Sequence, residues 1–469
     1  MPWAMADDVS LHSIVMERHP RQHTHIINDS HDDIALMLQA WIERSGQMPL
    51  YCLVIFDKTK SVKFHIDIMD LFIREAARWY IVDFSFATQS EVFCRLSTVD
   101  SYLPLLHSIF FEVGFLETRP SEVHISKAWN TPRLKEATIV AVSLLSRPAL
   151  EIIPSLAQVE DLLYTPNSLH KFLDLVSTFQ YLKYFHLDLV HEWDDVRALG
   201  DIQPSTITLP NVRHLGLFGL CSGVQQVLHR LVLPALQSLD LDFMESLDSS
   251  TAEQILRALG RLEDLSRCHI RRLSSPFTLF LPLNVPDLLA KIGPIRELRI
   301  LFSTDDDNIR AIHNFAVSDM FKQVTTMHMV FLEHPEDEPM LFSKAVSIVE
   351  SRMPPSQGGR GIGQLQALSF ETVRPSLSSG HQRETRISIN MQSVQRLLKL
   401  REDGLNLLGN VVDGKWCSLY SNRLQNLLEF RRAVRRWARF GHCDWLYTQE
   451  MGRYLENRDI LEKYSEILC

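Results

Sequence analysis

The sequence lacks the features that mark secreted, membrane and nucleic-acid-binding proteins. Its seven cysteines are an odd number without a C-x-x-C pair, which disfavours a disulfide framework or zinc knuckle and favours buried thiols in a reducing compartment. No run of about 18 apolar residues is present to cross a membrane. Residues 1–31 contain no apolar core of a signal peptide. We therefore expect an intracellular protein, cytoplasmic or nuclear.

The sequence also has no excess of basic residues. Its formal net charge of −9 provides no global field that attracts nucleic acid or an anionic membrane. Hydrophobic residues make up 45% and charged residues 22% of the 469 positions, which is ordinary for a globular protein with a large core. We therefore expect neither nucleic acid nor a membrane as a partner.

Two segments repeat one pattern 24 residues apart. Residues 209–217 (LPNVRHLGL) and 233–241 (LPALQSLDL) both read L-P-x-Φ-x-x-Φ-x-Φ, where Φ is apolar. The alternation at the end of each segment predicts a strand with one buried face. The Φ-x-x-Φ-x-Φ core recurs about every 28 residues, close to the period of leucine-rich repeats. Its first apolar residues are Leu50, Trp79, Leu106, Leu134, Val159, Leu182, Val212, Leu236, Leu265, Ile295, Val324 and Leu365.

Helical patterns lie between these strands. They cover residues 32–46, 167–175, 284–293 and 307–315, and a further helix is predicted to begin with the capping box Ser250–Glu253. A strand followed by a helix in each unit predicts an α/β fold, an irregular leucine-rich-repeat solenoid (a horseshoe) of short parallel strands and helices. The asparagine typical of such repeats is missing after Leu217, so we expect irregular curvature.

Composition divides the chain into four parts. Residues 1–31 are predicted to be a flexible polar N-terminus. Residues 32–373 are predicted to form the solenoid, with a long Gly/Pro loop at 353–364. A flexible loop is predicted at 374–388. The last part, 389–469, is predicted to contain a closing helix–strand element, with a helix over 391–402, and C-terminal helices that cap the solenoid.

Several of these segments resemble the F-box proteins with leucine-rich repeats that are expanded in mushroom-forming fungi. The resemblance lies in residues 36–55 (LMLQAWIERSGQMPLYCLVI), 77–79 (ARW), the two LP segments and 394–416 (VQRLLKLREDGLNLLGNVVDGKW), and it extends over 34–416. It implies a substrate-recognition subunit of a cullin-type ubiquitin ligase. In such subunits an N-terminal F-box binds the Skp-type adaptor and the repeats bind a target protein.

The sequence departs from that family at its beginning. The F-box pattern L-P-x-E-[IL]-x-x-x-I-F does not occur, and residues 1–33 are polar and rich in histidine. We therefore expect a non-catalytic protein-interaction module that contacts the Skp-type adaptor only if an F-box is supplied or cryptic. A folded gene remnant without function is a further hypothesis.

The residue between the last two apolar positions of each repeat is predicted to face the concave side of a solenoid, where such proteins bind partners. The positions directly after the third apolar residue of two repeats add Asp188 and Asp242. The alternative is that these positions are simply solvated. The predicted face comprises Asp83, Thr138, His186, Asp188, Gly216, Asp240, Asp242, His269, Arg299 and His328.

One motif suggests an enzyme instead. Residues 219–223 (GLCSG) follow a predicted strand and precede a predicted helix, as in the nucleophile elbow of hydrolases, with Cys221 as nucleophile. Asp242 and either His269 or His313 would complete a triad. The alternative is a small apolar residue at a tight turn. The N-terminal histidines, including His23 and His25, lack a visible framework for a metal, so we expect no metal and no cofactor.

Overall fold

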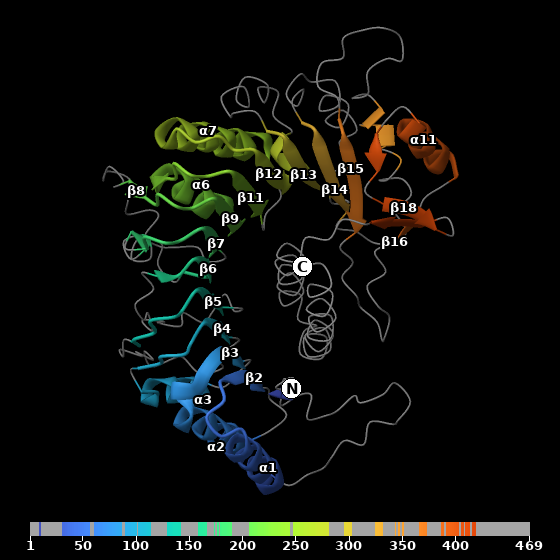
Figure 1. Cartoon of the computed structure of the whole chain (residues 1–469). Coiled ribbons are helices and arrows are strands. Elements are labelled where there is room, and N and C mark those ends of the chain that lie inside the picture. The colour runs from blue at the N-terminus through green and yellow to red at the C-terminus, as the bar shows by residue number, and fades with distance from the viewer. Residues whose placement is uncertain are drawn as a thin grey trace. The chain divides into compact units, whose positions relative to one another are not determined.

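The structure is a computed structural model of the chain, and its described residues belong to two compact units within residues 1–193 and 194–443 (Figure 1). Both units are built on open sheets of parallel strands accompanied by helices, so the prediction of an α/β fold is confirmed. The described residues are 9–10, 31–56, 61–86, 90–100, 102–113, 129–141, 158–166, 179–189, 206–243, 247–280, 295–302, 324–331, 365–372, 386–388, 391–402, 405–407, 409–412 and 415–418, with single positions in 173–177 and 343–350.

In the first unit, the strands of the sheet pair in the order of the sequence, and each pairing between these strands is parallel. Helices precede and follow the first long strands, as the alternating pattern predicts. The elements are β1 (Val9–Ser10), α1 (His31–Arg44), β2 (Leu50–Phe56), α2 (Val62–Arg74), η1 (Ala76–Arg78), β3 (Trp79–Phe86), α3 (Ser90–Cys94), η2 (Arg95–Thr98), β4 (Ser108–Val113), β5 (Glu136–Ala141), β6 (Asp161–Tyr164) and β7 (Tyr184–Leu189).

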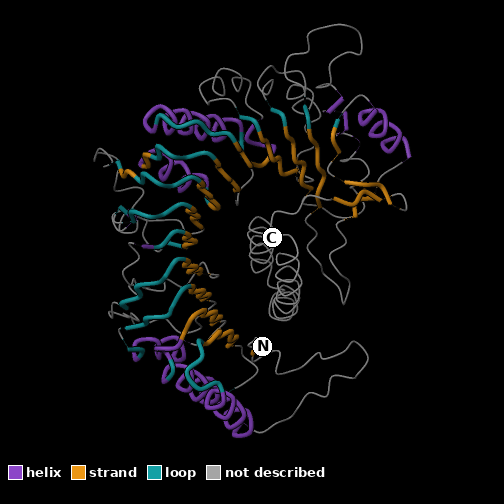
Figure 2. Tube along the Cα trace, in the orientation of Figure 1, coloured by secondary structure: helices purple, strands orange, loops and turns teal. Residues whose placement is uncertain are grey.

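The second unit repeats this arrangement. Its main sheet runs β9-β11-β12-β13-β14-β15-β17, again with parallel pairs, and helices α6 and α7 pack against each other beside it (Figure 2). The elements are β8 (Ile207–Thr208), β9 (His214–Gly219), α6 (Cys221–Arg230), β10 (Leu231–Val232), β11 (Ser238–Phe243), α7 (Ser249–Ser266), β12 (Arg272–Pro276), η4 (Phe277–Phe280), β13 (Glu297–Phe302), β14 (Thr326–Phe331), β15 (Ala367–Thr372), β16 (Arg386–Ser388), α11 (Met391–Glu402), β17 (Asn406–Leu407), β18 (Gly409–Val412) and β19 (Lys415–Ser418).

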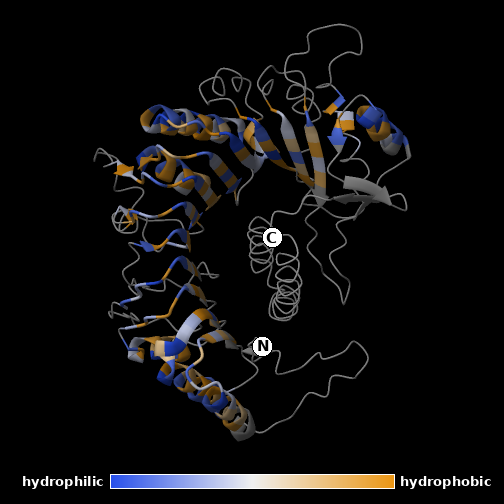
Figure 3. Cartoon of the chain, in the orientation of Figure 1, coloured by the Kyte–Doolittle hydropathy of each residue, from blue (hydrophilic) through white to orange (hydrophobic). Residues whose placement is uncertain are grey.

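The apolar positions of successive repeats align into a continuous core. Backbone pairing places Leu215, Leu239, Leu273 and Leu298 beside one another, and each is at most 1% exposed. Figure 3 shows the alternation of hydrophobic and hydrophilic residues along these strands. Burying a leucine contributes about 1.5–3 kcal/mol. The prediction that Leu215, Leu239 and Leu298 share one interior is therefore confirmed.

One predicted repeat has the wrong position. The pattern that begins at Leu265 predicts a strand at 265–270, but Leu265 lies in α7, where it is 44% exposed. The strand begins later, at Arg272. In the correct register the pattern starts at Ile270, and Ser275 stands where the third apolar residue is expected. A search for three apolar residues at this spacing therefore misses the strand. Ser275 is nonetheless fully buried, opposite Ile300.

The predicted helices are confirmed where the structure describes them, with one change. The helix predicted over 32–46 is α1, and that over 391–402 is α11. The capping box at Ser250 is wrong, because Asp248 is the N-cap of α7 and its carboxylate accepts a hydrogen bond of 2.6 Å from Thr251 N. Helix α2 was not predicted.

The closing element has its predicted order, a helix followed by strands. Strand β17 pairs with β15 at the end of the parallel sheet, while β16, β19 and β18 form a separate antiparallel sheet. Strand β16 starts at Arg386, within the predicted loop 374–388. The predicted helices over 284–293 and 307–315, the predicted C-terminal helices, the loop 353–364, most of residues 1–31 and all but position 173 of the predicted helix 167–175 lie outside the described residues.

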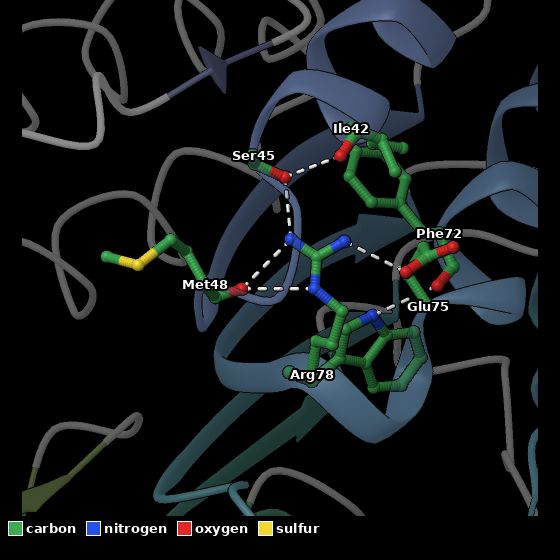
Figure 4. A network of polar contacts seen from close by, with 7 residues as sticks. Ile42, Ser45, Met48, Phe72, Glu75 and Arg78 are labelled. Carbon is green, nitrogen blue, oxygen red and sulfur yellow. Dashed lines mark hydrogen bonds and ion pairs between the residues drawn. The ribbon is translucent and has the colours of Figure 1, made fainter.

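A buried arginine joins three segments at the start of the first unit (Figure 4). Arg78, 7% exposed, donates to Met48 O from Nε (3.0 Å) and Nη2 (2.9 Å). Its Nη2 also donates to Ser45 Oγ at 2.6 Å, and its Nη1 pairs with Glu75 at 2.9 Å. Arg78 therefore ties the end of α1 and the turn before β2 to the start of β3.

Candidate functional site

Four of the residues assigned to a binding face in the second unit occupy one row of its sheet, while Asp242 lies two residues further along β11 and His269 lies outside the strands. Backbone pairing aligns Asp240 of β11, Arg299 of β13 and His328 of β14, with Ser274 of β12 between the first two. Gly216 of β9 precedes them in the same row. We call this set, together with Ser369 of β15, the central row. The shared alignment was predicted, but Ser274 and Ser369 were not.

The placement of His269 outside the strands is a correction. This histidine lies in the connection between α7 and β12, three residues before the strand, and it is exposed. The misplaced repeat at Leu265 caused the error. Ser274 occupies the position that had been assigned to His269, because Ser274 pairs with Asp240 on one side and Arg299 on the other.

The members of the central row that were predicted to face a partner on the concave side are buried. Asp240, Arg299 and His328 are each 1% exposed, and Asp242, two residues further along β11, is 2% exposed. Each row member lies between the equivalent residues of both neighbouring strands, which are about 4.8 Å away. Charged side chains so confined need polar partners in place of water.

The charged groups of this face pair across neighbouring strands. His214 Nε2 lies 3.3 Å from Asp240 Oδ2. Arg272 Nε lies 3.3 Å from Glu297 Oε1, and His328 Nε2 lies 3.4 Å from the same oxygen. These ion pairs join β9 to β11, β12 to β13 and β13 to β14.

Glu297 is held in its ionised form. The hydrogen bond with His328 is the main cause of a lowered pKa of the Glu297 carboxyl; burial opposes the shift, and Arg272 adds to it. The other ring nitrogen of His328, Nδ1, lies 2.6 Å from Ser369 Oγ. A carboxylate with a lowered pKa is a poor proton acceptor near neutral pH. The arrangement therefore serves electrostatic pairing better than acid–base catalysis.

In the first unit, the predicted residues also share a row, but apolar side chains interrupt it. Asp83 and Thr138 are separated by Phe110, and Leu163 precedes His186. Asp83 and Thr138 are half-buried, whereas His186 is 4% exposed. His186 is therefore buried, and the binding face stays a prediction for these three residues.

Asp188, assigned to the same face, is also buried. It is 1% exposed, and its Oδ2 accepts a hydrogen bond of 3.2 Å from Thr165 Oγ1. This bond links β7 to the residue that follows β6. Asp188 therefore links two neighbouring strands, and its assignment to a binding face stays a prediction.

A line of exposed polar residues lies directly before the strands, at the position that precedes the first residue of each strand. In the second unit this row begins with Arg213, Gln237, Arg271 and Arg296, all exposed, and the last three each donate the backbone N–H to the carbonyl of the one before at 2.8–2.9 Å. Thr325 and Gln366 continue the row. We call its first four residues the arginine row. It was missed because only positions inside the strands were considered. The signal was present, since each residue directly follows the first apolar residue of its repeat.

At the same position in the first unit, basic and acidic side chains alternate from strand to strand. Lys135 Nζ and Lys183 Nζ lie 2.5 Å from the two carboxylate oxygens of Glu160. Hydrogen bonds from both lysines lower the pKa of Glu160 to about 2. Opposite charges on adjacent strands therefore compensate each other at this position of the first unit.

The geometry around Cys221 does not assemble the suggested triad with His269. Cys221 begins α6 directly after β9, whose last residue Gly219 has a φ of 140°, so the strand–turn–helix context is confirmed. His269, however, precedes β12 and lies at the opposite end of the parallel strands. Five residues of strand separate the two ends, about 17 Å. His313 lies outside the described residues.

Cys221 is 6% exposed, which fits a small buried residue. Asp242 lies opposite Phe218 in the pairing of β9 and β11, and its Oδ1 accepts a hydrogen bond from Phe243 N at 3.0 Å. Cys52 and Cys268 are also buried free thiols, as predicted, while Cys94 is half-buried. Burial raises the pKa of Cys268 to about 11, which makes it a poor nucleophile.

Two further properties concern only the residues described. Among them, no three histidine, cysteine, aspartate or glutamate side chains gather in a way that could hold a metal ion. Of the helices in this part of the chain, none combines the length and apolarity needed to span a bilayer. His23 and His25 lie outside the described residues.

Comparison with known proteins does not assign the chain to a family. No protein-family model matches the chain, and no curated protein matches it at a significant level.

Proposed function

We propose that this protein is a non-catalytic protein-interaction module, an irregular leucine-rich-repeat solenoid of the type that recognises substrates in F-box ubiquitin ligases. The observation that carries the proposal is the register of the parallel strands. It sets one residue of every repeat beside its equivalents in neighbouring repeats, as at Leu215, Leu239, Leu273 and Leu298. Repeats that bury one face and align the other form extended surfaces for binding proteins.

The surface offered to a partner consists of the row before the strands and the first residues of the strands. Ser238, Arg272, Glu297 and Thr326 are half-exposed, unlike the buried central row. These residues present hydroxyl, basic and acidic groups in a line, which favours polar recognition of a folded partner. The central row beneath them fixes the strands through its cross-strand pairs.

The resemblance to F-box proteins supports a role in ubiquitin-ligase assembly. Arg78 gives that resemblance a physical basis, because it binds Ser45 and Met48 and so connects the two motifs that carry it, SGQMPL and ARW. The proposal includes the Skp-type adaptor only where an F-box is supplied or is cryptic in the chain. The target protein is recognised by the repeats in either situation.

The test of the interaction function uses partners captured by the full chain and bulky substitutions on the half-exposed face. Thr326→Trp and Ser238→Trp place an indole on that face, and Gln254→Trp, on the exposed side of α7, is the matched control. A partner that is lost with the first two and retained with the third supports the proposal. Partners that bind all three equally, or none that bind the wild type, contradict it.

Two measurements address the remaining hypotheses. Purified Skp-type adaptor is mixed with the purified chain, and a stable complex assigns the chain to the ligase. For the hydrolase hypothesis, Cys221→Ala is expected to leave partner binding unchanged, and a thiol-directed probe is expected not to label Cys221 in preference to other cysteines. Selective labelling of Cys221 would favour the enzyme.

A further inference from the structure

The arginine row differs from every other polar row described above in having charge of one sign. Arg213, Arg271 and Arg296 are exposed, and Gln237 lies between the first two. Within the part of the chain that the structure describes, none of the three guanidinium groups forms an ion pair. In the equivalent row of the first unit the charges are paired within the chain, because Glu160 binds a lysine on each side.

Like charges on adjacent strands repel one another. Arg271 and Arg296 are direct neighbours, because Arg296 N donates to Arg271 O at 2.8 Å. Acidic side chains near this row are engaged elsewhere: Glu297 binds Arg272 and His328. A row of basic groups without an internal counter-charge concentrates positive potential, and it attracts an anion from outside. The arrangement therefore favours a ligand over a structural role.

We propose that the arginine row binds a short acidic segment, rich in aspartate or glutamate, of the partner protein. From Arg213 to Arg296 the row crosses three strand intervals, about 14 Å, which is the length of four to five residues of extended chain. Guanidinium groups bind carboxylates through paired hydrogen bonds, and Gln237 supplies a further donor. This inference rests on the proposed function and specifies the chemistry of the partner.

Charge decides against nucleic acid as the ligand. The chain carries a net charge of −9, so its overall field opposes a long polyanion, and three arginines neutralise few phosphates. A short acidic peptide needs only local potential, because it occupies the row and little else. Nucleic acid binding is kept as an outcome of the experiment.

The experiment measures fluorescence anisotropy of a labelled peptide in which glutamate alternates with serine, mixed with the full chain. The same peptide with glutamine in place of glutamate and an oligothymidylate are the comparison probes. Arg271→Gln combined with Arg296→Gln is expected to weaken binding of the glutamate peptide about fivefold to tenfold. Arg261→Gln combined with Arg401→Gln removes the same charge from exposed helix positions and is expected to leave binding unchanged.

Charge reversal provides the decisive readout, because a misfolded variant cannot reproduce it. Arg271→Glu combined with Arg296→Glu is expected to lose the glutamate peptide and to bind a lysine–serine peptide that the wild type does not bind. Equal loss with the Arg261/Arg401 control, absence of glutamate-peptide binding to the wild type, or tighter binding of oligothymidylate would each overturn the inference.

Failure of this inference can be distinguished from failure of the proposed function. If the glutamate peptide does not bind but partners remain sensitive to Thr326→Trp, the face binds proteins by other chemistry. If partners are also insensitive to Thr326→Trp, the proposed function itself is wrong.

Discussion

Arg78 is the residue whose removal tests most directly how the first unit is held together. Its guanidinium serves two neutral acceptors, Met48 O and Ser45 Oγ, in a site where the residue is 7% exposed. Hydrogen bonds from a charged donor contribute about 1.5 kcal/mol each at the low end of their range, so two acceptors give about 3 kcal/mol. The pair with Glu75, whose side chain is 32% exposed, adds less than about 1 kcal/mol.

Arg78→Ala is therefore expected to lower the free energy of unfolding by about 3 kcal/mol. Arg78→Lys keeps the charge near Glu75, but one ammonium group cannot reproduce the fork that reaches both neutral acceptors, so a loss of about 1.5 kcal/mol is expected. The measurement is urea unfolding followed by tryptophan fluorescence, which Trp79 and Trp129 report because both are buried in this unit.

Hydrogen exchange of the α1 amides provides a second readout, since Arg78 holds the end of that helix against the sheet. Arg133→Ala, at an exposed position before β5, is the control and is expected to stay within about 0.5 kcal/mol of the wild type. The reasoning is refuted if Arg78→Ala is as stable as Arg133→Ala, or if lysine at position 78 destabilises as much as alanine.

Three further predictions concern the rows, a strained residue and the core. Glu160→Gln is expected to destabilise by about 1 kcal/mol at neutral pH; because the pKa of Glu160 is lowered from 4.5 to about 2, the difference should shrink as pH falls through that interval, and a constant difference in acid denaturation would contradict it. Arg267 ends α7 with φ 50° and ψ 33°, so Arg267→Gly should stabilise by about 1 kcal/mol in thermal unfolding, and a loss would show that its side chain matters more than backbone strain. Leu239→Ala should cost about 3 kcal/mol while Leu265→Ala, 44% exposed, costs little; equal costs would refute the register of β12.

Some strands could be predicted from the sequence, and others could not. Segments 209–217 and 233–241 predict β9 and β11 because an apolar residue at every second position leaves the strand one buried face. The prediction failed at β12, where Ser275 fills an interior position and Leu265, an exposed residue of α7, happens to fit the first apolar position of the pattern. A local pattern cannot reveal that a buried serine is tolerated between apolar neighbours.

The candidate site was predictable in alignment but not in exposure. Sequence spacing alone placed Asp240, Arg299 and His328 in one row, because strands of a repeat stack in a fixed register. Whether that row meets water depends on residues distant in sequence. His328 illustrates this, since its two ring nitrogens lie beside Glu297 and Ser369, one repeat away on either side.

The sequence by itself determined the period of the strands, the α/β class and the identity of the apolar core, because these follow from local alternation and from the spacing between repeats. Only the tertiary structure decided which polar row is buried and which is exposed. The reason is physical: a charged side chain can be buried where a neighbouring strand brings it a polar partner, as His214 does for Asp240, whereas Arg271 and Arg296 have no such partner among the described residues and are exposed.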